Sequence, residues 1–432
     1  MVPVLVDIPE VARAEVTFVW SLLCQHFGWS WERQEAGGAA AEIHIGVESG
    51  NLPVSRAFIE MLEAGRYDHS TVFRDEPLFR LTSGEVDHLG TAFYMVNSLQ
   101  EYGSRDLDEY GRFRYEASYQ HRFKNIDHDL VSQHFESLRE QVPELRAREV
   151  RYPAKAVFLS HDIDRIKFGV LSEGNYAVRT RNLRRAATVA WKAARGRSEW
   201  ANAAEVVQLH RRTGATSTFL WLPRSGTSAN GIVNADYELA DSQVVAELDV
   251  VRRAGFGLGL HKSAYETTLD DELALLPFPC SINRNHYLCM SLPEHYDQVQ
   301  ASQVRVDSTL GFSERMGYRN SYSRPFRPFS LKRRRAYDFL EVPLNMMDKS
   351  IFDSMRLHGQ EAEKAALEFL QAAPAGSVTA ILWHNNTLTK HRYAERLEVY
   401  EKLLECIRAS ALPTLSPSDF DEMLDESLSS SS

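Results

Sequence analysis

The sequence predicts an α/β protein built on buried parallel strands, and three features of the chain support this prediction. The apolar run at residues 156–160 is short and uninterrupted, which is typical of a strand covered on both faces of a parallel sheet. Similar runs follow at 218–222, 255–263 and 380–384. Several of these runs end in Asp or His, at the place where α/β sheets and barrels carry their chemistry.

The first run ends in an imidazole and two carboxylates, His161-Asp162-Ile163-Asp164. On an extended segment the side chains of Asp162 and Asp164 point to the same side, because the side-chain period of a strand is two. Two carboxylates aimed into one pocket repel each other unless a cation or a shared proton relieves the repulsion. A metal ligand beside a general base is one such arrangement. An Asx turn with both acids in solvent is the alternative.

Histidines also stand at the ends of later runs. His261 lies near the end of the run at 255–263, His384 ends the run at 380–384, and Arg284 and His286 follow the apolar residue Ile282. Random placement of the 15 histidines of this chain would not often put several of them at strand ends. The pattern is typical of a metal site on a scaffold of strands.

The order and spacing of these segments, over roughly residues 151–420, resemble the polysaccharide deacetylases, a family of metal-dependent carbohydrate esterases. The resemblance implies a distorted (β/α) barrel, preceded here by a smaller domain. Segments 307–310 and 317–319 also resemble one branch of the family. The matching motif residues are Asp162 and Asp164 (base and metal ligand), His261 (first histidine of the second motif), Arg284 (the arginine that orients the base) and Leu382-Trp383-His384 (last motif).

The chain departs from the family pattern at Tyr265, where the family usually has a second histidine. A catalytic zinc-type site needs about three protein ligands and an open position. We therefore expect His286 to replace the missing histidine, so that Asp164, His261 and His286 hold one divalent ion, for which we expect zinc. If His286 points elsewhere, the chain would be a binding protein without metal.

The resemblance implies an enzyme that hydrolyses a linear amide. It would remove an acetyl group from an N-acetylated sugar, or from a sugar-containing intermediate of polysaccharide or glycoconjugate biosynthesis. Asp162 would take the proton of the attacking water, Arg284 would orient Asp162, and His384 would protonate the leaving amine. Tyr287 and Trp383 are expected to line the sugar subsite or to pack in the core. The alternative function is a catalytically inactive carbohydrate-binding protein with a deacetylase fold.

Composition narrows the class of protein. The chain has 432 residues, 44% hydrophobic and 25% charged, with a net charge of −10. Its length predicts two domains, and its acidic balance argues against broad nucleic-acid binding. Four cysteines without zinc-finger spacing suit a reducing compartment. Because no signal peptide or long apolar run is found either, we expect a cytoplasmic protein, and no obligate protein partner is evident.

Residues 1–150 are predicted to form a smaller α+β domain, with helices at 9–27, 92–102 and 129–144 and a strand at 41–47. This region resembles the uncharacterised N-terminal domain of some cytoplasmic members of the branch. Its histidines, including His88 and His134, are expected to be surface residues or to form local hydrogen bonds, and Gly111-Arg112 is expected to be a turn. The barrel would span 151–425, and 426–432 would be a disordered serine-rich tail.

A basic segment follows the first strand. Its apolar residues Leu183, Ala187, Ala190, Trp191 and Ala194 recur at helical spacing, which predicts a basic amphipathic helix. We expect a solvated basic face packed on the barrel. The alternatives are contact with a phosphate-bearing sugar or with an anionic membrane surface. The nine basic residues are Arg165, Lys167, Arg179, Arg181, Arg184, Arg185, Lys192, Arg195 and Arg197, against one acid, Glu173.

Overall fold

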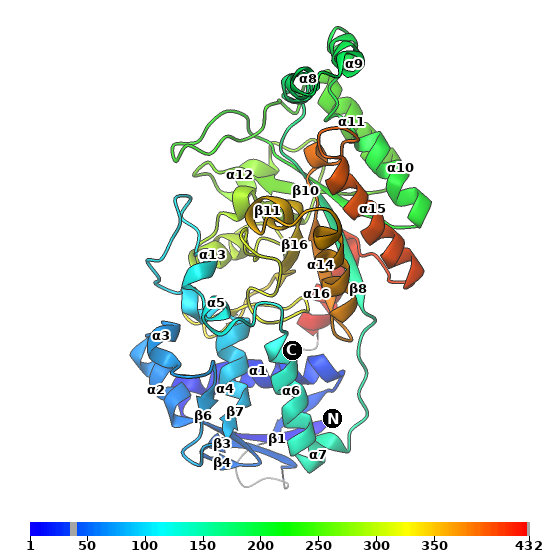
Figure 1. Cartoon of the computed structure of the whole chain (residues 1–432). Helices are drawn as coiled ribbons and strands as arrows, with labels where there is room; N and C mark the ends of the chain where they lie inside the picture. The colour runs from blue at the N-terminus through cyan, green and yellow to red at the C-terminus, as the bar shows by residue number, and fades with distance from the viewer. Residues whose placement is uncertain (35–40, 430–432) are drawn as a thin grey trace.

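The largest element of the protein is an eight-stranded sheet in the order β15-β12-β11-β10-β9-β8-β17-β16 (Figure 1). The computed structural model describes residues 1–34 and 41–429. All neighbouring strands of the sheet are parallel. The strands are β8 Ala156–Ile163, β9 Thr218–Trp221, β10 Gly257–Lys262, β11 Ile282–Asn285, β12 Val306–Asp307, β15 Leu340–Glu341, β16 Leu344–Met347 and β17 Val378–Leu382.

The sheet curls into a barrel-like shape. Its edge strands β15 and β16 lie at opposite ends of the strand order, yet only Val342 and Pro343 separate them along the chain. The two edges must therefore lie next to each other. All eight residues of β8 are buried, as expected for a parallel strand covered on both faces. The predicted α/β class and barrel are confirmed.

Helices cover the outside of the sheet. The core between them contains Val206, Leu248 and Leu403 together with sheet residues such as Phe219. Gly259 shows how close the packing is, because a Cβ atom there would lie 2.3 Å from the side chain of Leu220. The covering helices include α10 Ala203–Thr213, α11 Ser242–Ala254, α14 Gly359–Ala372 and α15 Ala394–Ala409.

The N-terminal region has its own four-stranded parallel sheet, in the order β2-β1-β3-β5. The predicted helices and the strand at 41–47 are present, whereas β1, which lies inside this sheet, was not predicted. The elements are β1 Val2–Asp7, α1 Glu10–Phe27, β2 Trp31–Gln34, β3 Ile43–Val47, β5 Leu52–Val54, α4 His88–Val96, the 3-10 turn Leu99–Glu101, α6 Leu130–Gln141 and α7 Pro143–Arg146.

Two of the N-terminal histidines are not at the surface. His88 and His134 are buried, and their Nδ1 atoms lie 2.9 Å apart. They are therefore hydrogen-bonding residues of the interior and not surface residues, because the first turn of α4 and the middle of α6 pack against each other at this point.

The N-terminal region and the barrel share a core. Phe329, from the segment between β12 and β15, packs against Phe18 and Phe93 of the N-terminal helices. A buried ion pair crosses the same boundary, because the Arg319 guanidinium donates to both carboxylate oxygens of Glu101, at 2.8 and 2.6 Å. Separating the partners of a buried ion pair leaves charges without a partner in the protein interior, which strongly destabilises the fold. The pair therefore holds the two regions in one relative position.

The basic segment forms two helices instead of one. Helices α8 (Gly169–Arg179) and α9 (Leu183–Ala193) make a hairpin that projects from the barrel, at the top of Figure 1. At the other end of the chain, α16 runs from Pro417 to Ser429, so that residues 426–429 of the expected tail continue a helix. Residues 430–432 lie outside the described residues. Within the described ranges, no helix is long and apolar enough to cross a membrane.

Candidate metal centre

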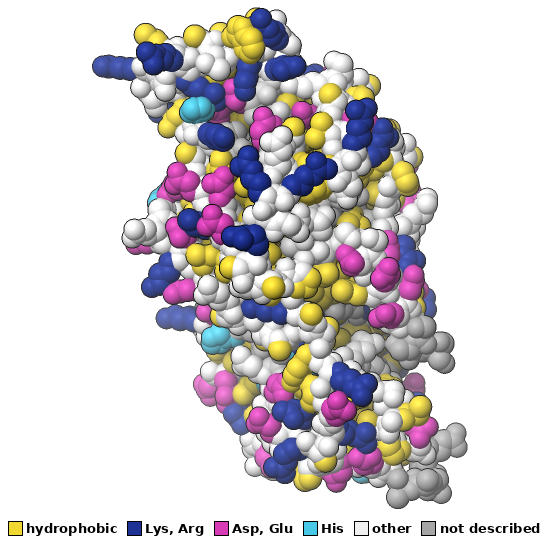
Figure 2. Space-filling view, turned by 90° about the vertical axis from the view of Figure 1, so that its right-hand side faces the viewer, with side chains coloured by type: hydrophobic (Ala, Val, Ile, Leu, Met, Phe, Trp, Pro, Cys, Tyr) yellow, Lys and Arg dark blue, Asp and Glu magenta, His cyan; other side chains and the backbone are white. Residues whose placement is uncertain are grey.

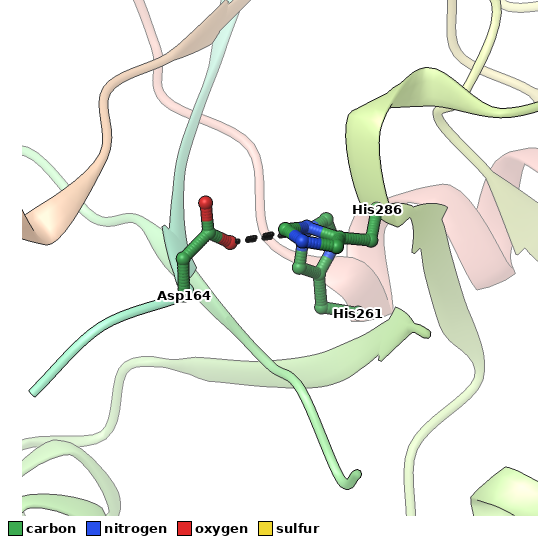
Figure 3. A group of neighbouring side chains, drawn as sticks. All are labelled: Asp164, His261 and His286. Carbon is green, nitrogen blue, oxygen red and sulfur yellow. Dashed lines mark hydrogen bonds and ion pairs between the residues drawn. The ribbon is translucent and has the colours of Figure 1, made fainter. Parts of the chain in front are cut away.

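Three side chains from three strand ends converge at one point. The Asp164 carboxylate points toward the rings of His261 and His286, as Figure 3 shows. Asp164 Oδ1 lies 3.2 Å from His261 Nε2 and 3.4 Å from His286 Nδ1, and the two ring nitrogens are 3.0 Å apart. Because β8, β10 and β11 run parallel, their carboxyl ends deliver these residues to the same edge of the sheet.

Backbone carbonyls orient both imidazoles. His261 Nδ1 lies 2.8 Å from the carbonyl oxygen of Arg284, and His286 Nε2 lies 3.2 Å from that of Val233. When each of these nitrogens donates its proton to the carbonyl, the other ring nitrogen presents a lone pair toward Asp164. Metal-binding histidines are commonly held in this way.

The three atoms fit a divalent cation. Asp164 Oδ1 is buried, and no donor in the described part of the chain forms a hydrogen bond with it. A tetrahedral ion with ligands at about 2.0–2.1 Å places its ligand atoms roughly 3.3–3.4 Å apart, close to the spacing observed here. Two imidazole nitrogens and one carboxylate oxygen form a donor set that suits zinc.

The electrostatics of the cluster favour added positive charge. Burial lowers the pKa of His261, but the carboxylates of Asp162 and Asp164 outweigh burial and raise the pKa above its ordinary value. Burial lowers the pKa of His286, which keeps this imidazole neutral and able to bind a metal. Tyr265, at the position of the missing family histidine, takes no part, because its hydroxyl donates to the carbonyl of Ser225 at 2.9 Å.

A second buried pair lies beside the cluster. Arg284 Nη1 donates to Asp162 Oδ1 and to Ser160 Oγ, both at 2.9 Å, and Arg284 Nε donates to the carbonyl of Ser308. The guanidinium is fully buried, so its position is fixed. The other carboxylate oxygen of Asp162 lies 3.6 Å from His261 Nε2, and Asp162 is therefore next to the candidate metal position.

His384 reaches the same place from β17. Its Nδ1 lies 2.6 Å from Asp348 Oδ1, and its Nε2 lies 3.7 Å from Asp164 Oδ2. Burial raises the pKa of Asp348, but the charge of His384 outweighs burial and lowers that pKa to about 2. Asp348 is thus an ionised partner that orients His384. Neither Asp348 nor its neighbour Lys349, whose ammonium lies 3.4 Å from Asp164 Oδ2, was singled out from the sequence.

A cavity of about 470 Å³ opens onto these residues, and the N-terminal region forms part of its wall. Tyr110 and Arg112 line the cavity together with Tyr287. Arg112 Nη1 donates to the carbonyl of Tyr287 at 2.7 Å, and the rings of Tyr110 and Tyr287 meet edge to face at 5.1 Å. The sequence predicts only a turn at Gly111-Arg112 and gives no sign of this contact. The sequence signal that could have indicated a role in the site is the presence of an aromatic residue, Tyr110, and a basic residue, Arg112, in a long loop. Functional residues are frequent in such loops.

Trp383 lies on the wrong side of its strand to contact a ligand in the cavity. Its side chain is fully buried, packs against Tyr400 and Phe352, and does not line the cavity. Side chains alternate along an extended segment, so that His384 faces the cavity and its neighbour faces the helices. Of the two roles expected of Trp383, the structure shows core packing and not the substrate contact. Tyr287 lines the cavity and is partly exposed there.

Comparisons with known proteins give a family match for the N-terminal region and structural similarity for a larger part of the chain. Residues 40–146 match the family of unknown function DUF7033, and that match ends at the last residue of α7. No curated protein matches the chain.

Three solved structures are similar at low identity. One is a polysaccharide deacetylase involved in O-antigen biosynthesis from Bordetella bronchiseptica (16% identity, 63% of this chain and 90% of that one, TM-score 0.30). Another is a polysaccharide deacetylase from Mycobacterium smegmatis (12%, 64% and 93%, TM-score 0.39). The third is a peptidoglycan N-acetylglucosamine deacetylase in complex with an N-hydroxybenzamide derivative (10%, 62% and 89%, TM-score 0.31).

Proposed function

We propose that this chain is a metal-dependent hydrolase that removes the acetyl group from an N-acetylated sugar, or from a sugar-containing intermediate of polysaccharide or glycoconjugate biosynthesis. The observation that carries the proposal is the convergence of Asp164, His261 and His286 around an unsatisfied carboxylate oxygen, beside the Asp162–Arg284 pair. Asp164, His261 and His286 would hold one divalent ion, with zinc as our choice. Such an ion supplies Lewis acidity, which polarises an amide carbonyl and makes water more acidic.

Asp162 is suited to act as the general base. Arg284 binds Oδ1 and balances the charge, which leaves Oδ2 to accept a proton from water near the candidate metal position. Proton transfer by a positioned carboxylate contributes about 10²–10⁴-fold to a rate. The role of Arg284 is to hold the Asp162 carboxylate in place.

His384 is suited to give a proton to the leaving amine. The Asp348 carboxylate accepts the Nδ1 proton, which fixes the orientation of the ring. The opposite ring nitrogen faces the cavity. Base and acid then reach the cavity from β8 and β17, which are neighbours in the sheet, and a linear amide could lie between them.

The sugar would occupy the cavity next to these residues. Tyr287 and Tyr110 offer ring faces and hydroxyl groups, and Lys349 and Arg112 offer positive charge.

The test is acetate release by the purified chain from N-acetylated sugars in free, nucleotide-linked and lipid-linked form, with and without a chelator. We expect release that stops when the metal is removed and returns when zinc is added. Binding of these sugars without release, by a chain that holds its metal, would support the alternative of an inactive carbohydrate-binding protein. The same result from a chain that holds no metal would also contradict the metal site.

A further inference from the structure

The hairpin of α8 and α9 exposes an unusual number of large hydrophobic side chains. Of the thirteen such side chains exposed in the described part of the chain, six lie between residues 168 and 191. Leu183 is 77% exposed, Val178 is 64% exposed and Trp191 is 54% exposed. The remaining three are Phe168, Leu171 and Tyr176. A concentration of exposed hydrophobic side chains in one short segment marks an interaction site more often than single exposed residues do.

The apolar stripe of α9 points away from the protein. Leu183, Ala187, Ala190, Trp191 and Ala194 share one face of the helix, and all five are exposed. An amphipathic helix that packs on a barrel turns its apolar face inward. Here the buried position of α9 is Val189, which contacts α8 near Gly174. The expectation that this segment packs on the barrel with a solvated basic face is therefore corrected.

The same hairpin carries positive charge without partners. Lys167, Arg185 and Lys192 form ion pairs with carboxylates of the protein. Five other arginines are exposed and have no ion pair with any carboxylate in the described ranges, and one of them, Arg195, lies over the ring of Trp191 at 3.8 Å. Figure 2 shows basic and hydrophobic side chains together at this end of the molecule. The five are Arg179, Arg181, Arg184, Arg195 and Arg197.

We propose that the α8–α9 hairpin docks the protein on a lipid bilayer that contains anionic lipids. A free phosphate group or a nucleic acid would be recognised by the arginines alone and would leave Val178, Leu183 and Trp191 in water. A bilayer surface accommodates both features, because basic residues meet the headgroups while leucine and tryptophan enter the boundary with the acyl chains. Each basic residue near an anionic surface adds to the affinity.

The hairpin leaves the barrel just after β8, the strand that leads to the candidate metal ligand Asp164. Asp164 follows the end of β8, and α8 begins only a few residues later, at Gly169. Arg165 ties this connection down, since its guanidinium donates to the carbonyl of Val233, which is also the carbonyl that orients His286. The proposal concerns binding alone and does not depend on the hydrolase function.

Vesicle flotation with the full chain tests the proposal. The vesicles contain phosphatidylcholine alone, or phosphatidylcholine with about one third phosphatidylglycerol. We expect the protein to float with the anionic vesicles, to bind neutral vesicles at least about tenfold more weakly, and to dissociate as salt is raised.

Two pairs of substitutions separate charge from apolar contact. Arg181→Glu with Arg184→Glu, and independently Leu183→Ser with Trp191→Ser, should each weaken binding by about tenfold or more. Matched changes at exposed residues elsewhere should leave it unchanged: Arg66→Glu with Arg146→Glu for charge, and Val245→Ser with Leu275→Ser for apolar surface. All these residues are exposed, and equal melting temperatures would show that the variants fold.

Three outcomes would overturn the proposal. The first is absence of flotation with anionic vesicles. The second is unchanged binding by the Leu183→Ser/Trp191→Ser variant while the arginine variant loses binding, which would indicate recognition of phosphate alone. The third is a concentration-dependent dimer that the Leu183→Ser/Trp191→Ser variant abolishes, which would assign the surface to a second copy of the chain.

Discussion

The barrel contains two buried histidine pairs, and they differ in the third group that each pair contacts. In the candidate metal centre, His261 Nε2 and His286 Nδ1 lie 3.0 Å apart. On the opposite side of the sheet, His161 Nε2 and His210 Nε2 lie 3.1 Å apart. In both pairs a backbone carbonyl binds the other nitrogen of one ring: that of Arg284 for His261 and that of Trp383 for His161.

The two pairs differ in the third group that they contact, which is a carboxylate in one pair and a hydroxyl in the other. The first pair faces a carboxylate oxygen of Asp164 that no hydrogen-bond donor satisfies. The second pair faces the Tyr400 hydroxyl, which lies 2.9 Å from His210 Nε2 and can donate a proton to an imidazole nitrogen. The Tyr400 hydroxyl can donate its own proton to an imidazole nitrogen, so this pair needs no cation. The Asp164 carboxylate has no proton to donate and faces the lone pairs of two imidazole nitrogens, so a cation is needed between them. Proximity of two imidazoles is thus not enough to make a metal site.

The largest effect should be on metal content. Asp164→Ala and His286→Ala each remove one of three ligands, and should lower zinc affinity by about 10²-fold or more, so that activity is lost with the metal. His210→Gln, at the other pair, should keep the metal. Elemental analysis after dialysis against a weak chelator measures this. If all three variants retained the same amount of metal, the Asp164 carboxylate would not be what makes one histidine pair a metal site and the other not.

The next effect separates the base from the ligands. Asp162→Asn should keep the metal and lower kcat by about 10²–10⁴-fold, because the amide cannot take the proton of water. Metal content and kcat are measured on the same preparation. Activity near that of the wild type would show that Asp162 serves only to pair with the buried Arg284.

A smaller effect is expected from the N-terminal wall of the cavity. The Tyr287 carbonyl accepts from Arg112, and both Tyr287 and Leu288 have positive φ, at 58° and 54°, directly after the ligand His286. Arg112→Ala should relax this strained turn, raise KM and weaken metal binding, each by about tenfold.

The matched control for this change is Arg114→Ala, two residues along the chain. Arg114 is exposed, and it pairs with Asp106 at 3.6 Å. The control should leave KM and metal binding unchanged. If Arg112→Ala and Arg114→Ala had the same effect on KM and metal binding, the contact of Arg112 with Tyr287 would not contribute to the function of the site.

The smallest effect concerns the pair without a carboxylate. Burial lowers the pKa of His161 to about 4 and that of His210 well below its ordinary value. Between pH about 6.5 and about 4 the unfolded chain therefore binds protons that the folded chain does not, and stability should fall as pH falls through this range.

Urea unfolding at pH 7 and pH 5 measures that loss. Each such histidine contributes at most about 1.4 kcal/mol per pH unit. His210→Gln should reduce the difference in the free energy of unfolding between the two pH values, whatever its effect on absolute stability. If the free energy of unfolding of His210→Gln differed between the two pH values as much as that of the wild type, groups other than this histidine pair would cause the loss of stability in acid.

The sequence by itself determined four strands of the barrel, at 156–160, 218–222, 255–263 and 380–384, and the residues at their ends, whereas β12, β15 and β16 were not predicted. The run at 156–160 is apolar without interruption because both faces of β8 are covered, and such a pattern is local. The parity of Asp162 and Asp164 on a strand is also local, and it predicted that both face the same cavity. His286 was expected beside them because it follows another strand end, and the fold brings it there.

Only the tertiary structure decided which other parts of the chain contact the residues at the strand ends. The tyrosine and arginine at 110 and 112 meet Tyr287 through a contact between segments 175 residues apart, which no local pattern records. Trp383 and His384 are neighbours in sequence, yet one lies in the core and the other at the cavity. The same holds for α9, whose apolar stripe predicted a buried face. Periodicity fixes which residues share a face, but only the packing of the whole chain fixes whether that face meets protein or solvent.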